Sequence, residues 1–286
     1  MPPWPLALST LGLPGGTLGD ACRLASGSGC AGLELRAHPD TGVHVGMSTR
    51  ERAGAARALA EAGLTPLAVA GYTRIAGPKP DEDVIPGLLA EITLAGDLGA
   101  RFLRVFPGGT GGTGGTGGTE GMGGVGGSGG PDGEADDERA ARRVHAVADH
   151  AARAGVRLLV ETHDSHATGA AVRRLLDTAG APEVTGAIWD VLHTWRRGES
   201  PAATFGALAD VLGYVQVKDA ASAADTTPVP LGAGGVPLAE IRAVLVERAY
   251  DGWVSLEWER TWYPAVAPVE SVIPGALAWT CGDAPG

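Results

Sequence analysis

Four carboxylate or carboxamide side chains stand at the ends of four separate apolar runs of this chain. Each run is typical of a buried β-strand, and a buried strand tolerates a carboxylate only where the charge has a strong partner. Four such strand ends that meet in space would surround a metal ion with oxygen ligands. The four residues are Glu161, Asp190, Gln216 and Glu257.

Residue spacing adds further side chains to this candidate site. Side chains alternate along a strand, so residues two positions apart share a face. His163 therefore joins Glu161, Lys218 joins Gln216, and Glu259 joins Glu257. His193 follows Asp190 by three residues, which places its imidazole near the same face, and we expect it to donate a hydrogen bond to a substrate.

The ligand types indicate both the metal and the reaction. Three carboxylates and one amide oxygen are hard ligands, so they favour Mn²⁺ or Mg²⁺, accept Co²⁺, and suit Zn²⁺ less well. A metal among them would polarise a substrate carbonyl and stabilise an enediolate. Glu161 and Glu257, on opposite sides of a bound sugar, could then move a proton from one carbon to another.

Composition narrows the functional classes. The 286-residue chain is 44% hydrophobic, carries a formal net charge of -11 and has a pI of about 5.1. An acidic surface disfavours nucleic acid and anionic membranes as partners. Cys22, Cys30 and Cys281 are too few and scattered for a disulfide framework, and no apolar run approaches the roughly 20 residues of a membrane span. We therefore expect a cytoplasmic protein with reduced thiols.

Apolar runs alternate with helical stretches along the whole chain. Continuous apolar strands between helices indicate a parallel sheet covered by helices, and about eight such units predict a single (β/α)₈ TIM barrel over 1–286. An open doubly wound sheet is less favoured, because no G-x-G-x-x-G follows the first strand. The expected strands are 5–9, 32–36, 66–71, 101–106, 156–161, 185–190, 213–218 and 253–257, and the expected helices include 49–62, 83–98, 136–154, 168–179, 201–211 and 237–249.

Glycines punctuate this pattern in two ways. Gly63, Gly99, Gly155 and Gly252 precede strands and are predicted to end helices in the left-handed conformation. The segment 108–133, after the fourth strand, is nearly all Gly and Thr and is predicted to be a flexible insert. It lacks the Gly-Lys-Ser/Thr of a phosphate-binding loop. A neutral expansion is favoured over a mobile lid.

Four segments of the chain resemble the xylose isomerase-like TIM-barrel family. They are Val160–Ser165 (VETHDS), Ile188–Glu199 (IWDVLHTWRRGE), Val215–Asp219 (VQVKD) and Gly252–Arg260 (GWVSLEWER). That family contains sugar (phosphate) isomerases and epimerases, inosose dehydratase and isomerase, 3-dehydroshikimate dehydratase and apurinic endonucleases.

The resemblance implies roles for particular residues. The four metal-binding positions of the family fall on Glu161, Asp190, Gln216 and Glu257, and the substrate-contacting histidine falls on His193. Gly32–Arg36 (GLELR) is similar to the second-strand motif, so Glu34 and Arg36 are expected to face the site. Many members carry histidine where this chain has Gln216. That departure weakens a zinc assignment and a direct transfer of the epimerase function.

The resulting hypothesis is a metal-dependent sugar isomerase or epimerase acting on a small sugar or cyclic polyol ketone. Glu161, Glu257, His193 and Lys218 would be its catalytic residues, with Lys218 stabilising negative charge. Further pocket candidates are Arg36, His163, Trp195, Arg260 and Trp262.

Other functions stay open. A dehydratase of the inosose or 3-dehydroshikimate type would start with the same proton abstraction and use the same residues. A non-enzymatic sugar-binding barrel is less favoured, because no carboxylate ligand is missing. A phosphodiesterase for abasic DNA is disfavoured by the few histidines and the acidic charge. The sequence leaves open whether the protein forms a homo-oligomer and whether its substrate is phosphorylated. The backbone amides of the 231–235 turn would contact such a phosphate. Asp219 is expected to be a structural hydrogen-bond acceptor.

Overall fold

Within residues 4–110 and 131–282, the part of the chain that the computed structural model describes, eight parallel strands close into a barrel. This closure confirms the predicted (β/α)₈ architecture and rules out the open doubly wound sheet. In their order around the barrel the strands are β1 (Leu6–Ser9), β10 (Trp253–Leu256), β7 (Leu212–Val217), β6 (Thr185–Asp190), β5 (Arg157–Glu161), β4 (Phe102–Phe106), β3 (Thr65–Arg74) and β2 (Gly32–Arg36).

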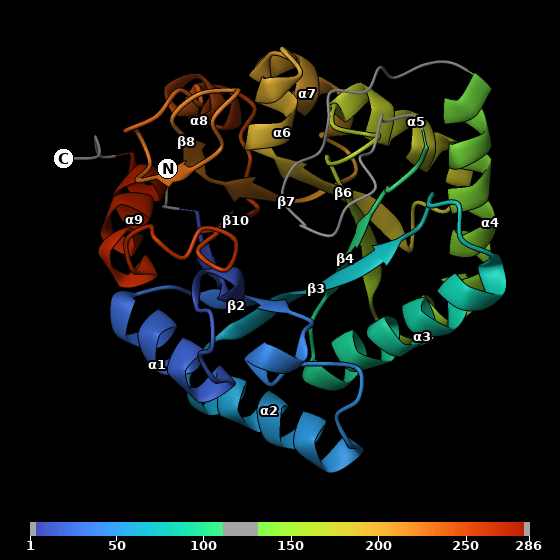
Figure 1. Cartoon of the computed structure of the whole chain (residues 1–286), viewed down its shortest axis with the longest axis horizontal. Helices are drawn as coiled ribbons and strands as arrows, with labels where there is room; N and C mark the ends of the chain where they lie inside the picture. The colour runs from blue at the N-terminus through green and yellow to red at the C-terminus, as the bar shows by residue number, and fades with distance from the viewer. Residues whose placement is uncertain (1–3, 111–130, 283–286) are drawn as a thin grey trace.

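Helices connect the strands and lie around the outside of the barrel (Figure 1). The described α-helices are α1 (Leu18–Ser28), α2 (Thr49–Glu61), α3 (Asp81–Leu98), α4 (Pro131–Ala154), α5 (Gly169–Ala179), α6 (Val191–Arg196), α7 (Pro201–Leu208), α8 (Leu238–Glu247) and α9 (Ile273–Cys281). Short 3₁₀ turns lie at η1 (Thr10–Gly12), η2 (Pro39–Thr41) and η3 (Val269–Ser271), and β8 (Asp219–Ala220) pairs with β9 (Pro228–Val229) outside the barrel.

The strands alternate between two separate apolar clusters. Outward side chains such as Leu35, Val105 and Val160 pack under the helices in the large cluster. Inward side chains from six strands form a small cluster that fills the lower barrel, namely Ala7, Ala68, Phe102, Leu159, Ile188 and Tyr214. Burying each large side chain contributes about 1.5–3 kcal/mol. The interior below the site is therefore a packed floor.

Two glycines make room for that floor. A Cβ at Gly213 would lie 2.2 Å from Cδ1 of Leu159, and one at Gly186 would lie 2.8 Å from its Cδ2. Only glycine lets Leu159 reach across the barrel here, because any larger side chain would displace it.

The predicted helix-ending glycines are mostly confirmed. Gly63, Gly99 and Gly155 adopt φ values of 68°, 76° and 67°. The prediction for Gly252 is wrong, because Ala249 takes the left-handed conformation after α8 instead. Gly252 is needed for space, since a Cβ there would lie 2.4 Å from the hydroxyl of Tyr250.

The described ends of the predicted insert 108–133 make specific contacts. The N–H of Gly109 donates to Oγ of Ser165 at 2.9 Å, and the N–H of Thr110 donates to Oδ2 of Asp136 at 2.6 Å. Helix α4 begins at Pro131, inside the predicted range. The central residues 111–130, and with them the predicted flexibility of the insert, lie outside the described part.

None of the described helices is long and apolar enough to cross a membrane.

Candidate metal centre and acid–base site

The four polar strand ends meet at the carboxyl-terminal edge of the barrel. Glu161 ends β5, Asp190 ends β6, Gln216 lies in β7 and Glu257 follows β10. The register pairs Asp190 with Gln216 across β6 and β7. All four side chains are buried, and the exposed fraction of each residue is at most 4%. The strand ends thus bring together three carboxyl groups and one carboxamide in a site closed to bulk water.

Lys218 lies among three of the carboxylates of this site. Its Nζ is 2.8 Å from Oδ2 of Asp190 and 2.6 Å from Oε1 of Glu259, and it also donates to Oε2 of Glu257. Burial lowers the pKa of Lys218, but the charges of Asp190, Glu257 and Glu259 outweigh burial and hold it well above its usual range. The side chain is therefore an ammonium at any working pH.

Arg104 is a second buried cation, and it was not predicted from the sequence. Its Nη1 donates to Oε2 of Glu161 at 3.2 Å and lies 3.8 Å from Oε1 of Glu257. Its Nη2 donates to the carbonyl of Gly71 at 3.0 Å, and its Cζ lies 4.2 Å from the centre of the Phe106 ring. Arg104 thus joins the two glutamates proposed as an acid–base pair.

A buried carboxylate holds the peptide that receives Arg104. The N–H of Tyr72 donates to Oε1 of Glu91 at 3.0 Å, so the peptide after Gly71 lies between Glu91 and Arg104. A Cβ at Gly71 would lie only 2.7 Å from Oε2 of Glu91. Glycine at this bulge of β3 is what allows the carboxylate from α3 to approach.

Glu34 faces the site, as the sequence resemblance implied. Its Oε1 accepts a hydrogen bond from Nε2 of Gln216 at 2.8 Å, and its Oε2 accepts one from Oγ of Ser255 at 2.5 Å. Burial, followed by the charge of Glu257, raises the pKa of Glu34. The side chain lies inside the barrel beside the carboxamide of Gln216.

His163 and His193 form one wall of the site. Their ring centroids are 4.2 Å apart, and the ring of Phe106 lies 4.6 Å from that of His163. Burial together with the charges of His163 and Lys218 lowers the pKa of His193 well below its usual range. At neutral pH His193 is therefore an uncharged imidazole, 3.6 Å from Oδ2 of Asp190.

Two sets of side chains could hold a divalent cation, and they share Glu161. One is the predicted set of Glu161, Asp190, Gln216 and Glu257. The other is Glu161, His163 and His193, whose nearest ligand atoms lie within 4.8 Å of one another. In the second set Nδ1 of His163 lies 2.8 Å from Oδ1 of Asp164, a close contact without hydrogen-bond geometry.

Two observations bear on whether the predicted set could hold a divalent cation. Its carboxyl groups, with that of Glu34, outnumber the buried cations Arg104 and Lys218. In addition, Oε1 of Gln216 is buried and has no hydrogen-bond partner among the described residues. Burial, together with the charges of Glu257 and Asp190, outweighs the charges of Arg104 and His163 and raises the pKa of Glu161 to about 8. A bound cation would oppose this rise.

The predicted pocket residues have different surroundings. Arg36 is held by Asp40, at 2.7 and 2.8 Å, and by the hydroxyl of Tyr72. The guanidinium of Arg36 lies 5.2 Å from the centre of the Trp262 ring, so Arg36 and Trp262 form one unit.

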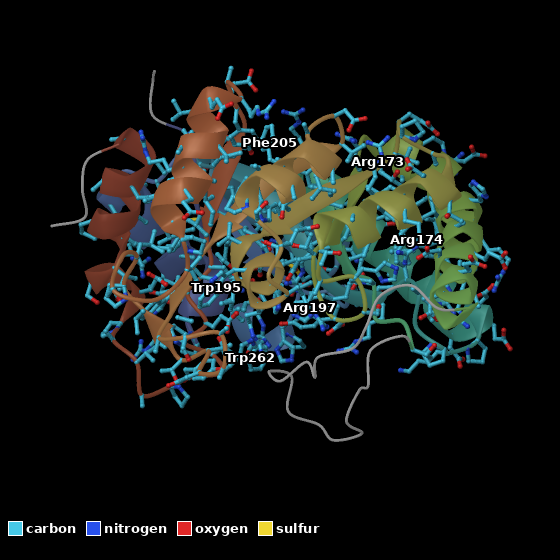
Figure 2. All side chains as sticks on the ribbon, turned by 90° about the horizontal axis from the view of Figure 1, so that it is seen from above. Arg173, Arg174, Trp195, Arg197, Phe205 and Trp262 are labelled. Atoms are coloured by element: carbon cyan, nitrogen blue, oxygen red, sulfur yellow. The ribbon has the colours of Figure 1, made fainter. Side chains whose placement is uncertain are left out.

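Figure 2 places Trp195, Arg197 and Trp262 toward one side of the molecule and Phe205 and Arg173 toward the other.

Trp195 and Arg260 also differ in their contacts. Trp195 packs on Gly235, where an added Cβ would lie 3.1 Å from its ring, so its role in the described structure is largely packing. The buried Nε of Arg260 has no hydrogen-bond partner in the described residues.

The glycine turn 231–235 is already bound to a carboxylate of the chain. The N–H groups of Gly232 and Gly234 donate to Oδ2 of Asp219 at 2.9 and 3.0 Å, and the N–H of Val236 donates to Oδ1 at 3.1 Å. The suggested phosphate contact through these amides is therefore wrong for the described conformation, and Asp219 is the structural acceptor that the sequence predicted.

Buried carboxyl groups, one carboxamide and two cations gather at the carboxyl-terminal edge of a closed (β/α)₈ barrel, which is where enzymes of this architecture carry their active sites. The family model of the xylose isomerase-like TIM barrel matches residues 22–281, and the chain belongs to this family. No curated protein matches the sequence.

Solved structures share the fold at low identity. A probable 3-DHS dehydratase from Bacillus anthracis involved in petrobactin synthesis is 19% identical, with a TM-score of 0.72 over 95% of this chain and 97% of that one. The 3-keto-D-glucoside 4-epimerase of E. coli, in its apo form, is 17% identical, with a TM-score of 0.72 over 98% and 99%. A D-psicose 3-epimerase studied with D-fructose is 14% identical, with a TM-score of 0.75 over 98% and 99%.

Proposed function

We propose that this protein is a divalent-metal-dependent isomerase or epimerase of a small keto-sugar or cyclic polyol ketone. The observation that carries the proposal is the placement of Glu161 and Glu257, which approach the same nitrogen of Arg104 from two strands. Two carboxylates that face one point in a closed, buried site are suited to transfer a proton within a substrate.

The proposed step uses the two glutamates in turn. One takes the proton from the carbon next to the substrate carbonyl. The other returns a proton to the opposite face of the same carbon, which epimerises it, or to the neighbouring carbon, which isomerises the sugar. Lys218 and Arg104 stabilise the negative charge that develops on the substrate oxygens. The neutral imidazole of His193 donates a hydrogen bond to a substrate hydroxyl.

The metal would be held by Glu161, Asp190, Gln216 and Glu257. When bound, it supplies Lewis acidity to the substrate oxygens. The oxygen-only ligand set favours Mn²⁺ or Mg²⁺ over Zn²⁺. The contribution of His163 is tested separately, because a His163→Ala variant that binds no Mn²⁺ would favour the alternative set with His193.

The test is a panel of keto-sugars and cyclic polyol ketones incubated with the protein and Mn²⁺ in D₂O. Proton NMR should show deuterium entering at a carbon next to the carbonyl, together with the epimeric or isomeric sugar. A panel without exchange, despite bound Mn²⁺, would support a non-enzymatic sugar-binding barrel.

A second candidate is a dehydratase acting on an acidic cyclic ketone such as 3-dehydroshikimate. The favouring observation is the pair of buried cations, Arg104 and Lys218, which could compensate the charge of a substrate carboxylate. Loss of water after the same proton abstraction yields a conjugated enone with new ultraviolet absorbance, which an epimerase does not produce. The absorbance of the product mixture therefore separates the two reactions.

A further inference from the structure

Gln216 is the only carboxamide side chain of the chain, which contains one glutamine and no asparagine among 286 residues. The residue is fully buried inside the barrel. Its strand neighbours in register are Asp190 on β6 and Ser255 on β10. The single carboxamide of the chain therefore lies at the centre of the candidate site.

The surroundings of Gln216 determine which way its amide points. Nε2 donates to Oε1 of Glu34 at 2.8 Å and lies 3.5 Å from Oε1 of Glu257. A carboxylate oxygen only accepts hydrogen bonds. In the reversed orientation the amide oxygen would face the carboxylates of Glu34 and Glu257, and no N–H would point toward them. Electrostatic repulsion therefore favours the observed orientation.

Glu34 is itself held in place. Oγ of Ser255 donates to its second oxygen at 2.5 Å, so both oxygens of Glu34 accept hydrogen bonds from neighbouring side chains. Ser255, Glu34 and Gln216 thus form a chain of hydrogen bonds across the inside of the barrel, from β10 through β2 to β7.

The free end of this chain is Oε1 of Gln216. It is buried and accepts no hydrogen bond from any described residue. A buried carbonyl oxygen without a partner is costly, because the group has lost its water. A cation bound at this oxygen would offset that cost and explain the orientation that Glu34 imposes.

We propose that Glu34 is a positioning residue that turns the carbonyl oxygen of Gln216 toward the bound divalent cation. This inference rests on the proposed metal-dependent function. It extends that function by explaining how a carboxamide serves at this position. A carbonyl oxygen fixed in one orientation is a hard donor, which favours Mg²⁺ or Mn²⁺ at this site.

The single carboxamide provides a direct probe. In a ¹⁵N–¹H spectrum of the metal-free protein, the only carboxamide NH₂ pair belongs to Gln216. We expect saturating Mg²⁺, a diamagnetic probe, to shift the ¹³Cδ resonance of Gln216 while its NH₂ pair stays hydrogen-bonded. Titration calorimetry measures the same binding independently.

Three nearly isosteric variants test the role of Glu34. Glu34→Gln allows Gln216 to point either way, so the Mg²⁺ concentration at half-shift should rise about tenfold or more. The reciprocal double variant, Glu34→Gln with Gln216→Glu, restores a donor facing an acceptor and should bind Mg²⁺ more tightly than Gln216→Glu alone. Glu199→Gln is the control, since the half-buried Glu199 accepts hydrogen bonds from Gly169 and Thr204 but does not contact Gln216, and it should leave the half-shift unchanged.

The outcomes separate this inference from the proposed function. A ¹³Cδ resonance of Gln216 that does not move at saturating Mg²⁺, or a Glu34→Gln variant with wild-type affinity, overturns the inference. A normal response without turnover of any keto-sugar supports the inference and overturns the proposed reaction. A protein that binds neither Mg²⁺ nor Mn²⁺ overturns both. Thermal unfolding of each metal-free variant reports whether that variant folds. If Glu34→Gln does not fold, the comparison of the double variant with Gln216→Glu still tests the inference.

Discussion

Lys218 places one positive charge among the carboxylates of Asp190, Glu257 and Glu259. It is one of two lysines in the chain, and the other, Lys79, is exposed. A cation at this position can stabilise both the folded metal-free protein and the charge that develops during the proposed reaction. These two roles can be separated by experiment.

Replacing Lys218 with methionine should destabilise the metal-free protein by about 3–5 kcal/mol, because buried carboxylates lose their partner. A bound divalent cation supplies positive charge to the same carboxylates. Added Mn²⁺ should therefore raise the melting temperature of the variant more than that of the wild type, as measured by differential scanning calorimetry. Lys79→Met is the control, and equal shifts in variant and wild type would count against a shared cation position.

Glu257→Gln should lower kcat on the keto-sugar substrate by about 10²–10⁴-fold while the fold persists, because the variant loses a proton acceptor and an anionic ligand. Steady-state assays with saturating Mn²⁺ measure this effect. The exposed Glu270→Gln variant should keep wild-type turnover. Unchanged activity of Glu257→Gln would remove Glu257 from the proposed acid–base pair.

At the scale of secondary-structure elements, a buried hydrogen-bond network fixes the loop between β5 and α5. Nε2 of His166 lies 2.7 Å from Oδ1 of Asp137 on α4, and Nδ1 lies 2.9 Å from Oγ of Ser165. Ser165 also accepts the N–H of Gly109, and Arg174 on α5 reaches Asp137 at 2.6 Å. The three side chains are arranged like the nucleophile, base and acid of a catalytic triad. However, the hydroxyl of Ser165 already accepts a hydrogen bond from Gly109 and shares its proton with His166. It therefore ties α4, α5 and the end of the β4 segment to the loop that carries His163.

Asp137 should make the stability of this network depend on pH. Burial raises its pKa, but the hydrogen bonds from His166 and Arg174 outweigh burial, and the net pKa lies below the usual 3.8. A lowered folded-state pKa gives a stabilisation that is complete above the unfolded pKa and is lost as the pH falls through the folded one. Asp137→Asn should cost about 1.5–3 kcal/mol at pH 7, and this difference should shrink below pH 3.8.

Urea unfolding at a series of pH values checks this effect, with the exposed Asp251→Asn variant as control. A difference between wild type and Asp137→Asn that stays constant from neutral to acidic pH would contradict the assigned network.

Strand periodicity explains how far the sequence could predict these elements. The eight barrel strands were placed correctly to within a few residues, because each is a short and mostly apolar run between helical stretches. Arg104 was missed, although one signal was present: it is a charged residue at the centre of the apolar run Phe102–Phe106. Alternation places it inside the barrel, but only the tertiary structure shows the carboxylates that compensate its charge.

Three helices and the β8–β9 pair were not predicted, for local reasons. Helix α1 contains Gly19 and Gly27 and is marked at its start by a capping box of Thr17 and Asp20. Helix α9 contains Pro274 and Gly275, which weaken a helical pattern. Helix α6 has only six residues and begins directly after the metal-ligand candidate Asp190, whose Oδ1 caps it by accepting the N–H of Leu192 at 2.9 Å.

At the scale of the whole molecule, the described segments before and after residues 111–130 are in contact with each other. The N–H of Thr110 and the carboxylate of Asp136 are 2.6 Å apart. Residues 111–130 are mostly Gly and Thr, and their two apolar side chains are Met122 and Val125.

Deleting 111–130 should change the melting temperature very little, because the entropy of closing a loop varies slowly with its length. Extending the deletion to 109–130 removes the hydrogen bonds of Gly109 and Thr110, and we expect it to cost about 1–3 kcal/mol. Thermal and urea unfolding of the two deletions measure this difference. A large loss of stability in the shorter deletion would show that 111–130 is packed against the barrel.

The burial of Gln216 also affects how the protein ages. Hydrolysis of side-chain amides is a common chemical lesion of heated or stored proteins, and asparagine and glutamine are depleted in heat-adapted proteins. This chain has one such group, and the folded barrel encloses it completely. We therefore expect a stored preparation to keep a single charge state on isoelectric focusing as long as it stays folded. A new acidic band that mass spectrometry assigns to deamidation of Gln216 would report that the barrel has opened.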